Sequence, residues 1–375
     1  MERIACCSGR RLAVPSSMPS TLIDSGPIPA KPQGARKPLR VAAFTGGEAV
    51  PSRIRVRQYI APLKYEDVEV TEFASSAGMY PPESKWARPA WGVWNVVEHI
   101  PDVLRSRSFD VTLLQREMLS TLVTLESFTG RPRVFDVDDA IWVHRRGSFA
   151  ARLAQLSDHV VCGNNFLAEK FSLWNPSVSV LPTAVDTSRF RPVLNRVLDP
   201  RQIIGWLGLS SGYQFLYSVE EALSHTLARH PRLTLRVVSD RPPRFRTIAS
   251  DRVEFIRYDA AREVEHIQEM TIGIMPIEDS EWSRGKCSYK MLLYMACGIP
   301  VVVSPFGMNA EILAQGTVGL GARTGANWVE CFETLLENSA LRELMGKEGR
   351  RVVLDHYSVD ILAPRLAQTL TSVAA

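Results

Sequence analysis

The sequence predicts an α/β protein with two Rossmann-like domains, each built on a parallel sheet. Three observations lead to this fold class. The chain has 375 residues, which is long enough for two hydrophobic cores of ordinary size. Short apolar runs that end in glycine or polar residues alternate with helical patterns along most of its length. The continuous β-branched run from Val301 to Val303 is typical of a strand covered on both faces in a parallel sheet.

The first half shows this alternation from its beginning. Leu39 to Thr45 is a short apolar strand that runs into Gly46 and Gly47, as in a βα turn where the backbone approaches a ligand, although a tight turn without a ligand has the same pattern. The remaining elements expected in this half are strands at 68–73, 110–114, 133–137, 160–162 and 178–181, and helices at 53–63 and 91–104.

The second half repeats the pattern. A strand at 203–207 leads into a loop with two glycines and two serines, Ser210 and Ser211, whose N–H and O–H groups are suited to holding a phosphate. The remaining elements expected here are strands at 233–238, 253–256, 272–275 and 301–303, and helices at 219–229, 260–270, 288–296, 327–338, 341–356 and 359–372.

Composition shifts set the expected domain boundaries. Residues 1–38 are rich in Pro, Ser, Gly and Ala without a period, which predicts a disordered leader. We expect an N-terminal domain at 39–195, a C-terminal domain at 196–356 and a final helical segment at 357–375, with the boundary between 192 and 201.

Composition also excludes several classes of protein. No apolar run approaches the roughly 18 to 20 residues that cross a bilayer, and the first residues lack the apolar core of a signal peptide. The six cysteines have neither metal-ligand spacing nor a disulfide pattern. The sequence therefore predicts a cytoplasmic protein with reduced thiols and no metal or cofactor of its own.

The net charge of +4 is modest, but basic residues gather near the start of the folded region. Arg53, Arg55, Arg57 and Lys64 surround one expected helix. A solvated basic face is one interpretation, and contact with an anionic membrane or a lipid diphosphate acceptor is the other. Nucleic acid is not expected, because aromatic residues are not interleaved with these cations.

The segment 283–313 carries the densest ligand-binding pattern. Arg284 and Lys286 precede one helix, which Gly298 and Pro300 terminate. The buried strand follows, and a second glycine loop leads into the next helix. Ligands of parallel sheets bind beyond the carboxyl ends of the strands, where the following helices begin. We therefore expect an anion in contact with the residues of the two loops: Arg284, Lys286, Gly307, Met308 and Asn309.

These residues also carry a resemblance to a known family. The run from Tyr289 and Lys290 through Gly298, Ile299 and Pro300 to Val302, followed by Ser304, Gly307 and Glu311, resembles the donor-site signature of family 4 glycosyltransferases (glycosyl transferases group 1). The resemblance implies the GT-B fold, with two Rossmann-like domains facing a cleft and a last helix that crosses back to the first domain. It also implies transfer of a sugar from a nucleotide diphosphate with retention of configuration and without a metal.

Polar residues at the ends of the first-half strands are the candidates for catalysis and acceptor binding. Gln115 and Glu117 follow one strand, and Asp138 and Asp139 follow the next. Asp138 stands where many family members have a histidine close to the transferred sugar. A carboxylate there can stabilise a positively charged transition state. His144 is either an additional base or an ordinary surface residue.

Two patterns leave alternatives open. Asp136 and Asp138 form an Asp-x-Asp motif, which binds a divalent metal in the other large class of glycosyltransferases. The two glutamates that many family members place eight positions apart are here Gly285 and Leu293, so the ribose must be recognised elsewhere. The nearby carboxylates are Glu278, Asp279, Glu281 and Glu311, and the last of these could simply face the dipole of its own helix.

Several functions follow from these observations. The leading one is a retaining, metal-independent glycosyltransferase that uses a nucleotide sugar and a hydroxyl acceptor, such as a lipid-linked glycan, in glycan or polysaccharide biosynthesis. An epimerase of the same fold would act on the nucleotide sugar alone, and a non-catalytic nucleotide-sugar-binding homologue would fit the missing glutamates. A purely structural interaction protein would have no use for so many glycine loops at strand ends.

Overall fold

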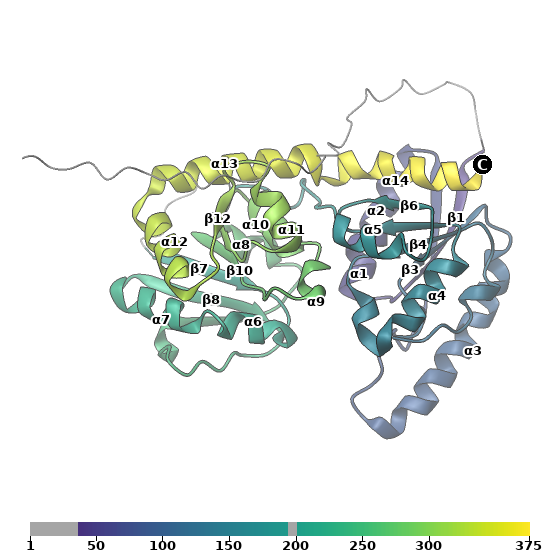
Figure 1. Ribbon diagram of the computed structural model, residues 1–375, viewed down its shortest axis with the longest axis horizontal. Helices are drawn as coiled ribbons and strands as arrows, with labels where there is room; N and C mark the ends of the chain where they lie inside the picture. The colour runs from purple at the N-terminus through teal and green to yellow at the C-terminus, as the bar shows by residue number, and fades with distance from the viewer. Residues whose placement is uncertain (1–36, 194–200) are drawn as a thin grey trace, which may run out of the picture. The chain divides into compact units, whose positions relative to one another are not determined.

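A computed structural model of the chain describes residues 37–193 and 201–375. The expected leader and the centre of the expected domain boundary lie outside these residues. The described chain forms two parallel sheets of six strands each. Both are covered by helices (Figure 1), and the two-domain Rossmann-like fold predicted from the sequence is confirmed.

The first sheet has the strand order β2-β1-β3-β4-β5-β6. Chain order reverses between β1 and β3, so the switch point of this sheet lies between these two strands. The loops after β1 and β3 therefore open at the same place on the sheet edge. The strands are β1 (Leu39–Thr45), β2 (Val68–Ala74), β3 (Val111–Gln115), β4 (Arg133–Val137), β5 (His159–Cys162) and β6 (Val178–Val180).

The second sheet has the order β12-β11-β10-β7-β8-β9, with its switch point between β7 and β10. Its last strand consists of Gly319–Gly321 and carries no β-branched pattern, and it was not predicted. The strands are β7 (Gln202–Leu207), β8 (Leu233–Ser239), β9 (Val253–Arg257), β10 (Ile272–Met275), β11 (Val301–Val303) and β12 (Gly319–Gly321).

The predicted helices are present with small shifts at their ends, whereas the helix Ser148–Leu156 was not predicted. The helix expected at 53–63 begins earlier and includes a π-helical turn over Arg53–Arg57. The helices of the first half are α1 (Val50–Ser52), α2 (Gln58–Tyr65), α3 (Arg88–Ser106), α4 (Ser148–Leu156) and α5 (Asn165–Phe171). Those that follow are α6 (Tyr213–Tyr217), α7 (Glu220–Arg229), α8 (Glu263–Gln268), α9 (Glu281–Arg284), α10 (Tyr289–Ala296), α11 (Gly307–Leu313), α12 (Gly325–Glu337), α13 (Ser339–His356) and α14 (Val359–Ala374).

The last helix, α14, returns to the first sheet, as the resemblance implied (Figure 1). Leu362, Leu366 and Leu370 are buried in one cluster with Val41 of β1 and Leu63 of α2. The residue boundaries expected for the domains remain predictions. In the described residues no helix is long and apolar enough to span a membrane.

Candidate functional site

The loop after β7 and the first turn of α10 meet at the switch point of the second sheet. Tyr294 of α10 ties the two elements together, because its hydroxyl accepts a hydrogen bond of 2.8 Å from the backbone N–H of Leu207 at the end of β7. The ring of Tyr294 lies so close to Gly273 of β10 that a Cβ there would be 2.5 Å from it. Glycine at this position therefore allows α10 to lie directly on the sheet and fixes its first turn beside the loop.

Lys290, in the first turn of α10, is the most informative residue at this point. Its ammonium lies 4.5 Å from the centre of the Trp206 ring, and a Cβ on Gly208 would be 2.6 Å from Nζ. Burial and the neighbouring Lys286 lower the pKa of Lys290 to about 8. Within the described part of the chain, Nζ has no hydrogen-bond acceptor. A partly buried cation without an acceptor, next to a glycine loop, is a suitable group for binding an anion.

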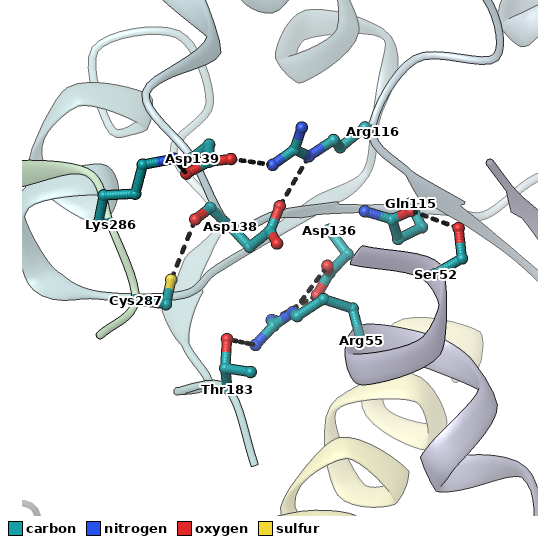
Figure 2. Close-up of polar contacts among 10 residues, drawn as sticks. All are labelled: Ser52, Arg55, Gln115, Arg116, Asp136, Asp138, Asp139, Thr183, Lys286 and Cys287. Atoms are coloured by element: carbon teal, nitrogen blue, oxygen red, sulfur yellow. Dashed lines mark hydrogen bonds and ion pairs between the residues drawn. The ribbon is translucent and has the colours of Figure 1, made fainter. Parts of the chain in front are cut away.

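Lys286 extends the positive charge toward the first sheet. Its Nζ lies 2.8 Å from Oδ1 of Asp139 and 4.2 Å from the centre of the Trp282 ring. Figure 2 shows that Arg116 reaches both carboxylates at the end of β4, with its Nε 2.7 Å from Oδ1 of Asp138 and a second bond to Asp139. Three cations, including Lys290, thus accompany two carboxylates, and the cluster has one positive charge in excess.

The pair of cations around Asp139 favours its ionised form. Burial would raise the pKa of Asp139, but Arg116 and Lys286 together hold it below the ordinary value. Arg116 has a backbone φ of 61°, in the left-handed region that few non-glycine residues adopt. Strained backbone of this kind occurs most often at functional sites, and here it accompanies the two bonds from Arg116 to the carboxylates.

Backbone contacts close the gap between the two sheets at the loop 284–287. The Asn164 amide donates to the carbonyls of Arg284 and Lys286, at 3.2 and 3.1 Å. A Cβ on Gly285 would lie 2.7 Å from the backbone nitrogen of Ala140. An open interdomain gap was expected beside this loop. The structure instead places it against the end of β4, because glycine permits so close an approach.

The phosphate-binding role expected for Arg284 does not fit the structure. Its guanidinium makes two bonds, of 2.7 and 3.1 Å, to the carboxylate of Asp279, and half of its side chain is exposed. The ammonium of Lys290 instead lies beside Trp206 and Gly208, at the loop after β7. An aspartate five residues upstream thus already neutralises Arg284.

The serine loop also differs from the expectation. The backbone N–H and the hydroxyl of Ser210 donate to the carboxylate of Asp240, at 2.6 and 2.9 Å, so these donors are not directed at a phosphate. Ser211 is exposed. A surface cavity of about 420 Å³ next to this loop is lined by Ser210, Tyr213, Tyr217, Arg241, Pro242 and Arg244.

The residues at the start of α11 were expected to contact a bound anion. They pack against other parts of the protein instead. Met308 is buried, and a Cβ on Gly307 would be 2.9 Å from the Arg284 Cα. The Asn309 amide donates to the carbonyl of Ser304 at 3.0 Å, and its carbonyl oxygen accepts from Ser288. Glu311 accepts a bond of 3.2 Å from Asn165, and burial raises the pKa of this glutamate.

Gly46 and Gly47, expected to bind the donor, follow β1, and the expected acceptor-side residues Gln115 and Glu117 lie at the end of β3. Gly46 is covered by Met79, whose Sδ would be 2.4 Å from a Cβ at that position, and Gly47 has a φ of 65°. Glu117 accepts a bond from the Thr121 N–H, while its second carboxylate oxygen, like Nε2 of Gln115, is buried and unpartnered among the described residues. His144 is exposed and packs its ring edge-on against Trp282 at 5.1 Å.

Two members of the basic cluster predicted from the sequence are paired within the protein, while Lys64 is exposed. Arg55 is buried and forms bonds of 3.0 and 2.6 Å with Asp136 (Figure 2). Arg57 binds Glu48 and Glu72. The Asp-x-Asp motif is occupied for the same reason, since Arg55 holds Asp136 and Arg116 holds Asp138. No group of three or more acidic, histidine or cysteine side chains in the described residues is arranged to hold a metal ion.

The fold defines the class of this protein. Two parallel six-stranded sheets with a last helix crossing back form the GT-B arrangement of glycosyltransferases, as the resemblance predicted. Residues 201–338 match the family model described as glycosyl transferases group 1. Over this segment the chain is similar to glycosyltransferases, and the resemblance predicted from the sequence is confirmed there.

Similar solved structures agree on the fold. Sucrose-phosphate synthase from Thermosynechococcus elongatus is 15% identical, with a TM-score of 0.65 over 89% of this chain and 98% of that one. HepE from Anabaena, in complex with UDP and glucose, is 12% identical, with a TM-score of 0.64 over 89% of this chain and 100% of that one. WaaG, a glycosyltransferase involved in lipopolysaccharide biosynthesis, is 14% identical, with a TM-score of 0.62 over 88% and 99% of the two chains. No match was found among curated proteins.

Sequence reasoning missed the roles of Lys290, Arg116 and Trp206. Lys290 belongs to the run that carries the resemblance to a donor site, and no separate role was assigned to it. The available signal was its place in that run, just after Lys286 and at the start of a helix.

Proposed function

We propose that the protein is a retaining, metal-independent glycosyltransferase that moves a sugar from a nucleotide diphosphate to a hydroxyl acceptor. The observation that carries this proposal is the ammonium of Lys290, which has no acceptor among the described residues and lies beside Gly208 at the switch point between β7 and β10. In open α/β sheets ligands bind at such points. A diphosphate there would supply the negative charge that the cluster lacks.

The electrostatics suit the departure of a diphosphate. Charge that develops on the leaving group is stabilised most by cations already held in place, and Lys286 and Lys290 are held by the aromatic rings of Trp282 and Trp206. These lysines supply positive charge that a metal provides in other transferases. The arginine bonds to Asp136 and Asp138 also favour a mechanism without a metal.

The carboxylates of Asp138 and Asp139 have a different role in this mechanism. Both are bonded to Arg116, and they would face the positive charge that develops on the sugar as its bond to the diphosphate breaks. The acceptor hydroxyl would bind on the side of Gln115 and Glu117, whose amide nitrogen and one carboxylate oxygen have no partner within residues 37–193 and 201–375. Attack from the face that the diphosphate leaves would retain the configuration.

The cellular setting is part of the proposal. We place the protein in the cytoplasm, and the buried free thiols of Cys162, Cys287, Cys297 and Cys331 are in keeping with a reducing compartment. Its product would be a glycan or polysaccharide. A non-catalytic nucleotide-sugar-binding protein is the second candidate, favoured by Leu293 and Gly285 at the positions of the two usual glutamates.

A donor panel tests this function. The full chain is incubated with UDP-, GDP- and ADP-sugars, and the release of nucleoside diphosphate and any change of the sugar are followed by chromatography. UDP is the first nucleotide to test, because the similar HepE structure contains UDP. Slow hydrolysis of one donor is the expected result. An epimerised sugar nucleotide would indicate an epimerase, and binding without turnover would indicate the non-catalytic homologue.

Replacing Lys286 with alanine is expected to weaken binding of a nucleoside diphosphate by about 1.5 to 3 kcal/mol, the range for hydrogen bonds to charged groups. Titration calorimetry with UDP measures the change. Lys347→Ala is the matched control, because Lys347 is exposed on α13 and pairs only with Glu343. An affinity for UDP that is the same in Lys286→Ala and in the unsubstituted protein would remove Lys286 from the site.

A further inference from the structure

Helix α3 has a surface with no role in the proposed transferase site. Its inner side is buried through Asn95, His99 and Val103. Its outer side carries an apolar stripe at helical spacing, and Trp86 lies just before the helix. The exposed fractions are 95% for Trp86, 65% for Val93, 57% for Trp94, 53% for Val97, 44% for Ile100 and 57% for Leu104.

The spacing makes these side chains one continuous surface. Val93, Val97, Ile100 and Leu104 follow each other at intervals of three and four residues, so they lie on the same side of the helix along about 16 Å. A shallow groove of about 170 Å³ continues the stripe and is lined by Ile100, Val103, Leu104, Arg107, Leu125 and Phe128. Contiguous exposed apolar surface of this kind usually marks an interaction site.

Charge distribution indicates what this surface meets. The exposed residues Lys85 and Arg88 lie at the start of α3, and Arg105 and Arg107 lie at its end. No acidic residue occurs in the first turn. Glu98 is turned toward the body of the protein, where its carboxylate accepts a bond of 2.8 Å from the hydroxyl of Ser75. The apolar stripe therefore has cations at both ends.

We propose that the outer face of α3 docks on the surface of a bilayer that contains anionic lipid. An amphipathic helix with tryptophan on its apolar face and lysine and arginine beside it is suited to lie in the plane of such an interface. Trp86 and Trp94 match the preference of indole rings for the headgroup level. The cations would contact lipid phosphates, and a protein partner would not require them at both ends of the stripe.

This surface replaces the basic cluster that the sequence suggested for membrane contact. Arg55 and Arg57 are bonded to carboxylates of the protein itself, whereas the apolar stripe of α3 faces solvent. The proposal concerns the first half alone, and it stands whether or not the chain transfers a sugar.

Vesicle flotation of the full chain tests the proposal. We expect binding to vesicles of phosphatidylcholine with about 30% phosphatidylglycerol, and at least tenfold weaker binding to pure phosphatidylcholine. The double variant Val97→Glu/Leu104→Glu should bind the anionic vesicles at least about tenfold more weakly than the unsubstituted chain. Lys85→Gln and Arg88→Gln should each weaken binding to the anionic vesicles about fivefold. Raising the salt concentration should weaken binding of the unsubstituted protein.

The matched controls are Leu173→Glu and Leu344→Glu, which place the same charge on residues that are 72% and 55% exposed on other elements. Both controls should bind vesicles as the unsubstituted chain does, and all variants should keep its melting temperature. Failure of the full chain to bind anionic vesicles would overturn the proposal. Equal binding of anionic vesicles by Val97→Glu/Leu104→Glu and by the unsubstituted chain would overturn it too. The same holds if the unsubstituted protein self-associates in solution and this variant does not.

Discussion

Replacing Lys290 with methionine is expected to stabilise the free protein and to abolish measurable binding of a nucleoside diphosphate. A lysine in the unfolded chain has a pKa of about 10.4. The pKa of about 8 in the folded protein means that folding makes the charged ammonium less stable. Removing this charge should raise the free energy of unfolding at pH 7 by about 2 to 3 kcal/mol. The loss of a buried cation should weaken UDP binding at least about a hundredfold. Thermal unfolding with and without UDP measures both effects.

The variant Lys286→Met is the control for this experiment. Its ammonium already pairs with Asp139, so its removal leaves that carboxylate with Arg116 alone and should not stabilise the protein. If Lys290 had only a structural role, Lys290→Met would give the opposite result. The variant would then have a lower melting temperature than the unsubstituted protein and the same affinity for UDP. That outcome would remove the main support for the donor site.

Lys290 also sets an expected pH dependence. Because its pKa is lowered in the folded state, the unfolded chain binds more protons between about pH 8 and pH 10.4, and stability should rise with pH across this window. UDP binding should change in the opposite direction and weaken as pH rises through about 8, since the ammonium loses its charge. In Lys290→Met both slopes should be absent. Calorimetry between pH 7 and pH 9 tests the binding, and chemical denaturation extended to pH 10.4 tests the stability.

Breaking the buried ion pair at β4 is the second large effect. Arg55→Met is expected to destabilise the protein by about 3 to 5 kcal/mol, because Asp136 would remain as an uncompensated charge in the core. The loss should be smaller at low pH, where Asp136 is protonated. Urea denaturation at pH 7 and pH 4.5 measures both values.

The double variant Arg55→Met/Asp136→Leu completes this test. An apolar pair of similar volume often replaces a buried ion pair without loss, so the double variant should recover most of the stability at pH 7. A double variant as unstable as Arg55→Met would assign the loss to the bonds of Arg55 with the Leu181 carbonyl and with Thr183 instead.

Periodicity and breakers were sufficient to predict most of the fold. The first strand at 39–45 and the buried strand at 301–303 were predicted with the bounds that the structure gives, because apolar runs followed by glycine or proline leave few alternatives. The strand Gly319–Gly321 could not be predicted, since it is formed by glycines and exists only through its pairing with β11. Its sequence alone favours a turn.

The site was harder to predict, because charge alone does not say where a side chain is directed. Arg284 and Ser210 have the right chemistry for a phosphate, yet Asp279 and Asp240 already bind them. Lys290 was overlooked because it shares a helix with Met291 and Leu292, which are buried. Sequence reasoning identified the correct loops, and only the three-dimensional packing showed which cation remains unpaired.

The return of α14 to the first sheet also affects the order in which the protein is made. Val41, Val56 and Leu63 belong to the same buried cluster as Leu362 and Leu366, which lie close to the C-terminus. During synthesis the N-terminal half leaves the ribosome long before these leucines do, so they cannot cover its apolar surface until α14 has emerged. The core of the first half is therefore completed only after the whole second half has been made.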